Sequence, residues 1–358
     1  MHSFLRPFDQ YITALIAVGI TCAGALTFFS TKAPDFDLRS LGDGSWQSSY
    51  EAAFDDVNVI KSEAVHAYNA LQIMLVGQIQ SDVVIGSNKW LFSETEYKLN
   101  PSYSDTLTQN ISTVASVVAD LQSRGIDVKV VALPDKARVM ADHAPSNRGA
   151  LVDGRYSALV DGLTSKGVAV ISPLDHLISA TSHGPMYMRS DTHWTPEGAI
   201  EVAKLVAADT DEKGSVSKTL TRVGEREHIG DLYRFLDLGR YREWLNFEYE
   251  TVSEYALGSG SASLEADLFG ASTVDGAIHL IGTSYSEDVR WSFADAIEVQ
   301  SGRPVVNFAQ KGYGPLKPMF DYLDQLTANS ELPDIIIWEI PEKYMSLTPS
   351  EMGERGDA

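Results

Sequence analysis

Length, composition and charge exclude several classes of protein. The chain has 358 residues, 44% hydrophobic and 22% charged, which fits one large globular α/β domain or two domains. Its formal net charge of −21 argues against nucleic acid as a partner, because neutralising phosphates requires Lys and Arg. A single cysteine, Cys22, rules out an internal disulfide and a cysteine metal site.

An uncharged run comes first in chain order. Residues 11–29 carry no charge and are just long enough to span a bilayer as a helix. We expect residues 1–30 to form a signal-anchor helix that attaches the chain to a bacterial inner membrane, with the body on the periplasmic side. A cleavable signal peptide ending near Ala23-Gly24-Ala25 is the alternative, and it also places the body in the periplasm.

Helices and strands alternate along the rest of the chain. Residues 31–80 are predicted to be a polar linker followed by a helix over Tyr50–Gln80, and residues 346–358 a polar tail. Residues 211–276 are less regular and indicate an insertion. The remaining elements are a hairpin of Val83–Ile85 with Trp90–Phe92, strands at 126–133, 168–171, 277–281, 304–308 and 334–340, and helices at 104–124, 154–166, 174–180, 195–208, 287–299 and 316–326. Strands separated by helices predict a parallel sheet covered on both faces.

Ser284 lies in the turn between a predicted strand and a predicted helix. The helix N-terminus offers free N–H groups and partial positive charge, which favour a developing oxyanion. A serine here therefore suits nucleophilic work. Taken alone, it fits an ordinary helix cap better, because Ser and Thr are preferred caps.

Asp191 and His193 form a second candidate group. In extended backbone, residues two apart point to the same side, so the carboxylate can orient the imidazole. This is the base-and-orienter half of a serine triad. A surface histidine and a capping aspartate are the plain alternatives. A metal site would need more ligands than these two and His183, so we expect no metal and no cofactor.

Several motifs together resemble the alginate O-acetyltransferase family, SGNH-hydrolase-like proteins of bacterial exopolysaccharide acetylation. They run in the family's order from about residue 85 to 345. The motifs are Lys89-Trp90-Leu91-Phe92, Leu133-Pro134-Asp135-Lys136, Asp191-Thr192-His193-Trp194-Thr195-Pro196-Glu197-Gly198, Gly230-Asp231-Leu232, Gly282-Thr283-Ser284-Tyr285-Ser286, Asn307 to Pro315, and Trp338 to Tyr344.

The resemblance implies an SGNH-hydrolase-like, flavodoxin-like domain over residues 81–345, similar to the membrane-anchored J component of the alginate machinery. It makes Ser284 the nucleophile, His193 the general base and Asp191 its orienter. Aspartate and histidine precede the serine, which is a circularly permuted order relative to ordinary SGNH hydrolases.

The oxyanion hole is incomplete in sequence. The resemblance points to the Ser284 N–H and to Gly312 as donors, but the usual asparagine block is replaced by residues 339–342. Tyr313 and Tyr344 are candidate substitutes, or else packing residues. Lys136 follows a strand end and is either a substrate contact or a solvated loop lysine.

The implied activity is O-acetyl transfer to an exopolysaccharide, alginate or a similar polymer. Expected partners are a membrane-bound O-acyltransferase that supplies acetyl, other acetylation and secretion proteins, and the polysaccharide itself. Two alternatives remain at this stage: an SGNH-type carbohydrate acetylesterase, and a non-catalytic subunit of the acetylation complex.

Overall fold

The computed structural model describes residues 18–19, 21–79, 82–210, 214, 217–258, 276–326 and 332–354. Within the expected membrane segment, residues 11–17 and 20 lie outside this described part, and residues 18–19 and 21–30 are helical. No helix in the described part is both long enough and apolar enough for a membrane span. The chain divides into two units, Met1–Ile79 with Asp237–Phe247, and Gln80–Leu236 with Glu248–Ala358.

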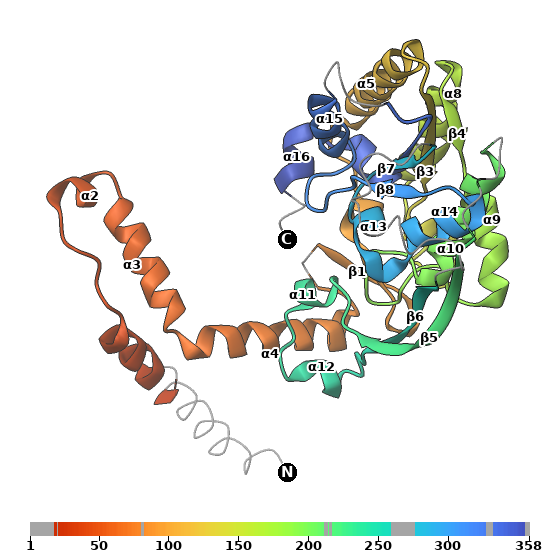
Figure 1. Cartoon of the computed structure of the whole chain (residues 1–358). Helices are drawn as coiled ribbons and strands as arrows, with labels where there is room; N and C mark the ends of the chain where they lie inside the picture. Colours follow the sequence, from red (N-terminus) through yellow and green to blue (C-terminus); the bar gives the residue numbers. More distant parts are fainter. Residues whose placement is uncertain are drawn as a thin grey trace. The chain divides into compact units, whose positions relative to one another are not determined.

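The described part of the smaller unit is mainly helical. Besides the helical residues 21–30, it contains α2 (Leu38–Gly42), α3 (Ser45–Asp56), α4 (Val59–Val76) and α12 (Tyr241–Trp244) (Figure 1). The prediction of one helix over Tyr50–Gln80 is wrong, because the helix begins earlier and is interrupted at Val57 and Asn58. The Asn58 Oδ1 accepts a hydrogen bond from the Lys61 N–H at 3.3 Å, which starts a second helix.

A five-stranded sheet forms the centre of the larger unit. The strand order is β4-β3-β9-β7-β8, and every neighbouring pair is parallel. This confirms the predicted α/β class with a parallel sheet. The strands are β3 (Asp127–Leu133), β4 (Ala169–Ile171), β7 (Ile278–Ile281), β8 (Val305–Asn307) and β9 (Ile335–Pro341).

Side chains of the sheet alternate between two hydrophobic clusters. Val131 and Leu133 of β3 face one cluster, and Val130 and Ala132 face the other. The first cluster is closed by α9 (Leu174–Ala180), α10 (Pro196–Ala208) and α14 (Phe293–Ser301). The second is closed by α5 (Tyr103–Ser123), α8 (Arg155–Ser165) and α15 (Leu316–Gln325). Helices therefore cover both faces of the sheet (Figure 1).

Two antiparallel pairs flank this core. The predicted hairpin is confirmed as β1 (Val83–Ile85) with β2 (Leu91–Ser93). Inside the predicted insertion, β5 (Thr219–His228) pairs with β6 (Glu250–Gly258), a two-stranded ribbon that the sequence did not predict. Residues 211–213, 215–216 and 259–275 of that insertion lie outside the described part. The other elements are η1 (Ser87–Lys89), η2 (Glu94–Glu96), α6 (Lys136–Val139), α7 (Ala150–Asp153), η3 (Thr181–His183) and α11 (Tyr233–Leu236).

The helix expected after Ser284 is broken into three pieces. They are α13 (Ser284–Glu287), the 3₁₀ helix η6 (Val289–Trp291) and α14. Ser292, between the last two, has a φ of 58°, which ends one helix and starts the next.

The polar tail is more ordered than its composition predicted. After η7 (Glu342–Ser346), residues Pro349–Glu354 form α16. Met352 is 1% exposed and joins the second hydrophobic cluster. The Glu351 carboxylate accepts hydrogen bonds from the N–H and hydroxyl of Thr348, which caps the helix. Met352 and the hydrogen bonds of Glu351 therefore dock this polar segment.

Candidate active site

The turn between β7 and α13 presents Ser284. A Cβ on Gly282 would lie 2.5 Å from the Glu339 Oε2, so this close approach requires glycine. Thr283 is the helix cap, and its side chain accepts from the Tyr285 N–H. Because Thr283 fills the capping role, the Ser284 hydroxyl is left for another partner.

Glu339, on β9, supports this turn through hydrogen bonds. Its buried carboxylate accepts from the Thr283 N–H at 2.8 Å, the Thr283 hydroxyl at 3.0 Å and the Ser286 hydroxyl at 3.1 Å. Burial raises the pKa of Glu339, and these hydrogen bonds act against that shift. In the sequence, residues 339–342 replace the asparagine block that usually supplies a donor to the oxyanion hole. In the structure, Glu339 of this segment instead supports the turn that carries Ser284.

Asp191 and His193 lie in a tight loop rather than in extended backbone. Tyr187 and Trp194 form an antiparallel bridge across the loop. At its tip, the Asp191 Oδ1 accepts from the His193 N–H at 2.9 Å and from the His193 Nδ1 at 2.5 Å. The pairing expected from the spacing is present, but an aspartate-centred turn produces it.

Ser284, His193 and Asp191 form a continuous hydrogen-bonded chain. The His193 Nε2 lies 2.8 Å from the Ser284 Oγ. With Nδ1–H donating to Asp191, Nε2 is the acceptor for the serine proton.

Burial and charge act in opposite directions on both titrating members of this chain. Burial disfavours the charged form of His193, but the charge and hydrogen bond of Asp191 outweigh it and raise the pKa of His193. Burial likewise opposes ionisation of Asp191, yet His193 and its donors hold the pKa of Asp191 well below its usual value. Asp191 is therefore an anion that supports an imidazolium.

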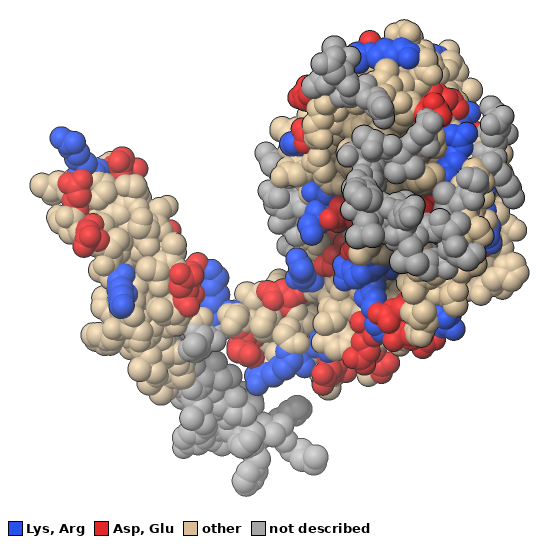
Figure 2. Space-filling model, viewed as in Figure 1, with Lys and Arg blue, Asp and Glu red and all other residues tan. Residues whose placement is uncertain are grey.

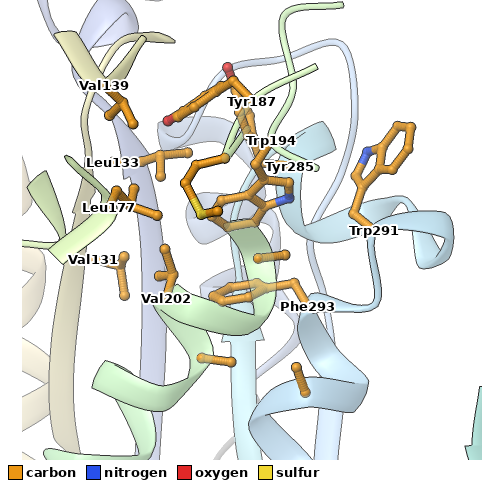
Figure 3. Packing of buried hydrophobic residues seen from close by; sticks show 14 of the residues in the cluster. Val131, Leu133, Val139, Leu177, Tyr187, Trp194, Val202, Tyr285, Trp291 and Phe293 are labelled. Atoms are coloured by element: carbon orange, nitrogen blue, oxygen red, sulfur yellow. The ribbon is translucent and has the colours of Figure 1, made fainter. Parts of the chain in front are cut away.

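Two aromatic side chains pack against the imidazole of His193. The His193 ring lies 4.7 Å from the Tyr285 ring and 5.8 Å from the Trp291 ring, between centroids. The Trp194 ring lies 5.5 Å from the Tyr285 ring and 4.6 Å from the Phe293 ring, between centroids. Figure 3 shows these side chains packed together. The residue after the histidine is thus a core residue that anchors the loop.

Lys136 has neither of its expected roles. It is 1% exposed, so it is not a solvated loop lysine, and it is not among the residues that line the cavity beside Ser284. Its Nζ donates to the carbonyls of Leu91, Arg189 and Asp191 at 2.5, 3.1 and 3.0 Å. Burial lowers the pKa of Lys136 to about 8. The lysine therefore ties the Asp191 loop to β2.

Two residues beside the triad were not singled out from sequence. His228 donates to the Asp191 Oδ2 across 2.7 Å. Asp231 accepts from the Thr192 N–H at 2.8 Å and from the Thr192 hydroxyl at 2.6 Å. The Gly230-Asp231-Leu232 motif signalled this segment, but nothing in the sequence near His228 linked it to Asp191.

A cavity of about 380 Å³ opens over Ser284 and His193. Gly312 and Tyr344 line it, as expected of oxyanion or substrate residues, and Gly312 has a φ of 92°. Tyr313 does not line it; the residue is 40% exposed, and the Lys317 ammonium lies over its ring. The remaining lining residues are Asp82, Ser93, Thr95, Thr192, Asp231, Leu232, Phe235, Lys311, Lys343 and Leu347.

Lys343 is a further cavity residue that sequence reasoning missed. Its ammonium lies over the rings of Tyr285 and Tyr344, and 3.5 Å from the Tyr285 hydroxyl. Burial acts against its charge, but Tyr344 and nearby acidic groups raise the pKa of Lys343. It is therefore a cation at the wall of the cavity.

Asp191, His193 and Asp231 are the one group of possible metal-binding side chains found in the described part, with donor atoms within 4.8 Å of one another. Each of those atoms already takes part in the hydrogen bonds described above. The arrangement is that of a proton-transfer site.

Comparison with known proteins gives a consistent result. Residues 83–342 match the family described as SGNH hydrolase-like domain, acetyltransferase AlgX. A protein named probable alginate O-acetylase AlgJ from Azotobacter vinelandii is 33% identical over 342 residues, covering 93% of this chain and 86% of its own length. The protein of the same name from Pseudomonas aeruginosa is 32% identical over 364 residues, covering 97% and 92%.

A solved structure agrees. The O-acetyltransferase domain of Pseudomonas putida AlgJ superimposes with a TM-score of 0.67 at 25% identity, covering 75% of this chain and 94% of that domain. The chain belongs to the family of SGNH hydrolase-like acetyltransferases. Its enzyme class is accordingly that of the acyltransferases.

Proposed function

We propose that this chain transfers acetyl groups to hydroxyls of an exopolysaccharide through an acetyl-Ser284 intermediate. The observation that carries the proposal is the pair of short contacts from the Ser284 Oγ to the His193 Nε2, 2.8 Å, and from the His193 Nδ1 to Asp191, 2.5 Å. These contacts lie at an open cavity, so an acyl donor can reach the serine.

The reaction has two symmetrical halves. His193 takes the proton of Ser284 as the Oγ attacks the acetyl carbonyl, and then gives that proton to the leaving group. An acceptor hydroxyl next attacks acetyl-Ser284 while His193 takes its proton, and the proton returns to Ser284. The N–H groups of Ser284 and Gly312 are the proposed donors to the oxyanion.

The polymer and its setting are part of the proposal. Because the relatives are named alginate O-acetylases, we take alginate or a similar exopolysaccharide as the acceptor. Residues 11–29 would tether the chain to the inner membrane with the catalytic unit in the periplasm. A membrane-bound O-acyltransferase would supply acetyl from the cytoplasmic pool, beside other proteins of acetylation and secretion.

The charge of the molecule bears on how an anionic polymer is accommodated. The coloured part of the face drawn in Figure 2 carries both acidic and basic side chains, and no single sign covers it. Lys311 and Lys343 line the cavity together with Asp82 and Asp231. Within the cavity, Lys311 and Lys343 are therefore the groups that attract a carboxylate.

The test compares an acetyl ester alone with the same ester plus an oligosaccharide acceptor. We expect acetyl to appear on the acceptor with wild-type protein and to be lost with Ser284→Ala and His193→Ala. Ser157→Ala, an exposed serine on α8, serves as the matched control. Release of acetate alone, whatever the acceptor, would identify an esterase. Full polymer acetylation in cells by both variants would identify a non-catalytic subunit.

A further inference from the structure

Asp191 is hydrogen-bonded on both carboxylate oxygens. Oδ1 is occupied by His193, as described above. Oδ2 accepts from the His228 Nε2 at 2.7 Å and from the Asp231 N–H at 3.1 Å. Asp191, which orients His193 through Oδ1, is therefore itself oriented through Oδ2 by His228 and Asp231.

His228 is fixed by its own surroundings. It is the last residue of β5, is 5% exposed, and lies edge-on to Trp291 at 5.5 Å between centroids. The Arg226 Nη1 lies 3.4 Å from the His228 Nδ1. Because a guanidinium only donates hydrogen bonds, the His228 Nδ1 is the acceptor. The His228 Nε2 is therefore protonated and donates a hydrogen bond to Asp191.

The ribbon of β5 and β6, which carries His228, also contacts the Asp191 loop at other residues. The Glu250 carboxylate, at the start of β6, accepts from the N–H groups of Arg189 and Ser190 at 2.7 and 2.8 Å. A Cβ on Gly230 would lie 1.9 Å from the Ser190 carbonyl oxygen, so the two segments are in close contact. His228 therefore reaches Asp191 from a well-anchored position.

We propose that His228 is a positioning residue for acyl transfer, holding Asp191 against His193 through its Nε2–H, with Arg226 selecting the tautomer that donates. The relay runs from Arg226 through His228, Asp191 and His193 to Ser284. This inference rests on the proposed function, since it assigns a role within the same reaction.

The relay has a measurable electrostatic consequence. A donor on Oδ2 shares the negative charge of Asp191 and so weakens its pull on the His193 imidazolium. Removing that donor makes the carboxylate more basic and raises the pKa of His193 further. The other charged groups that act on His193 or His228 include Asp231, Lys343, Asp288, Glu339 and Arg226.

The experiment follows acetylation of Ser284 in the full chain by a chromogenic acetyl ester, as a function of pH. For His228→Ala we expect a rate about tenfold lower, with KM for the ester within about twofold. In the plot of kcat/KM against pH, the acid limb shifts to higher pH by about half a pH unit or more. His228→Gln keeps an amide donor and restores much of the rate and the wild-type limb. His176→Ala, which removes a histidine paired with Glu201 outside the cavity, is the control.

An unchanged acid limb in a folded His228→Ala protein overturns the inference, because a merely structural role lowers the rate without moving the limb. If that variant does not fold, imidazole ¹H–¹⁵N spectra of wild-type protein decide the matter. The Nε2–H tautomer at His228 is required, and an Nδ1–H tautomer contradicts the relay. Wild-type protein that never acetylates Ser284 refutes the proposed function, a result distinct from either of these.

Discussion

His193 sets the pH range in which Ser284 is a nucleophile. Only the neutral imidazole accepts the serine proton, and the environment raises the pKa of His193 above its ordinary 6.5. The protonated form therefore persists to higher pH, and the rate falls as pH drops through the raised value. We predict that Ser284 acetylation reaches half its maximum above pH 6.5, measured from the rate of chromophore release.

The Asp191→Asn variant tests whether Asp191 is responsible for the raised pKa of His193. An amide cannot stabilise the imidazolium and favours the wrong tautomer of His193, so acetylation should slow by at least about 100-fold. The acid limb should also move down, because the charge that raised the pKa is gone. A limb that stayed in place would mean that another group governs it.

Lys136 is the second residue whose role is specific enough to test. Replacing it with methionine keeps the apolar stem and removes a buried donor from three carbonyls, of which that of Arg189 keeps the Leu91 N–H at 2.9 Å. We expect Lys136→Met to lower the free energy of unfolding by about 2–4 kcal/mol, measured by urea denaturation. Lys166→Met, an exposed lysine, should change it by less than about 0.5 kcal/mol. Equal effects of the two variants would contradict the assignment.

Among individual residues, the sequence predicted those whose role shows in the residues next to them in the chain. Ser284 was marked by a strand-to-helix turn, and Asp191 with His193 by their spacing. Lys136 and His228 act through partners far along the chain, so their burial and contacts depend on the tertiary fold. A lysine at a strand end looks solvated until three distant carbonyls are seen to surround it.

The turn between β7 and α13 depends on close contact between two strands. We predict that Gly282→Ala lowers the free energy of unfolding by about 1–3 kcal/mol and abolishes most acetylation, because the added methyl group collides with Glu339 and Ser286. Thermal denaturation and the ester assay measure the two effects. Gly149→Ala, where a Cβ meets nothing within 4 Å, should alter neither.

Elements with strong periodicity were predictable, and polar ones were not. Strands such as β3 and β9 carry apolar residues on both faces, as expected where helices cover both, and the sequence shows this directly. The ribbon of β5 and β6 is buried only at His228 and Val252 and carries charges such as Arg222 and Glu225, so it lacks an apolar pattern. The breaks at Asn58 and Ser292 are local capping events that periodicity alone does not reveal.

The net charge of the whole molecule opposes an anionic acceptor. With −21 charges on the chain, a polyuronate is repelled at long range, and salt screens that repulsion. We predict that KM for a uronate oligosaccharide falls as ionic strength rises toward about 0.2 M. KM for a neutral acetyl ester should stay constant, and a rising KM for the uronate would show that local lysines dominate instead.

Formation of acetyl-Ser284 is the claim on which the mechanism depends. Mass spectrometry of the full chain, quenched after incubation with a chromogenic acetyl ester, tests it directly. Wild-type protein should gain one acetyl group on the peptide that contains Ser284, and the Ser284→Ala protein should gain none. Turnover of the ester with no acetyl on that peptide, or with acetyl on another residue, would contradict the account.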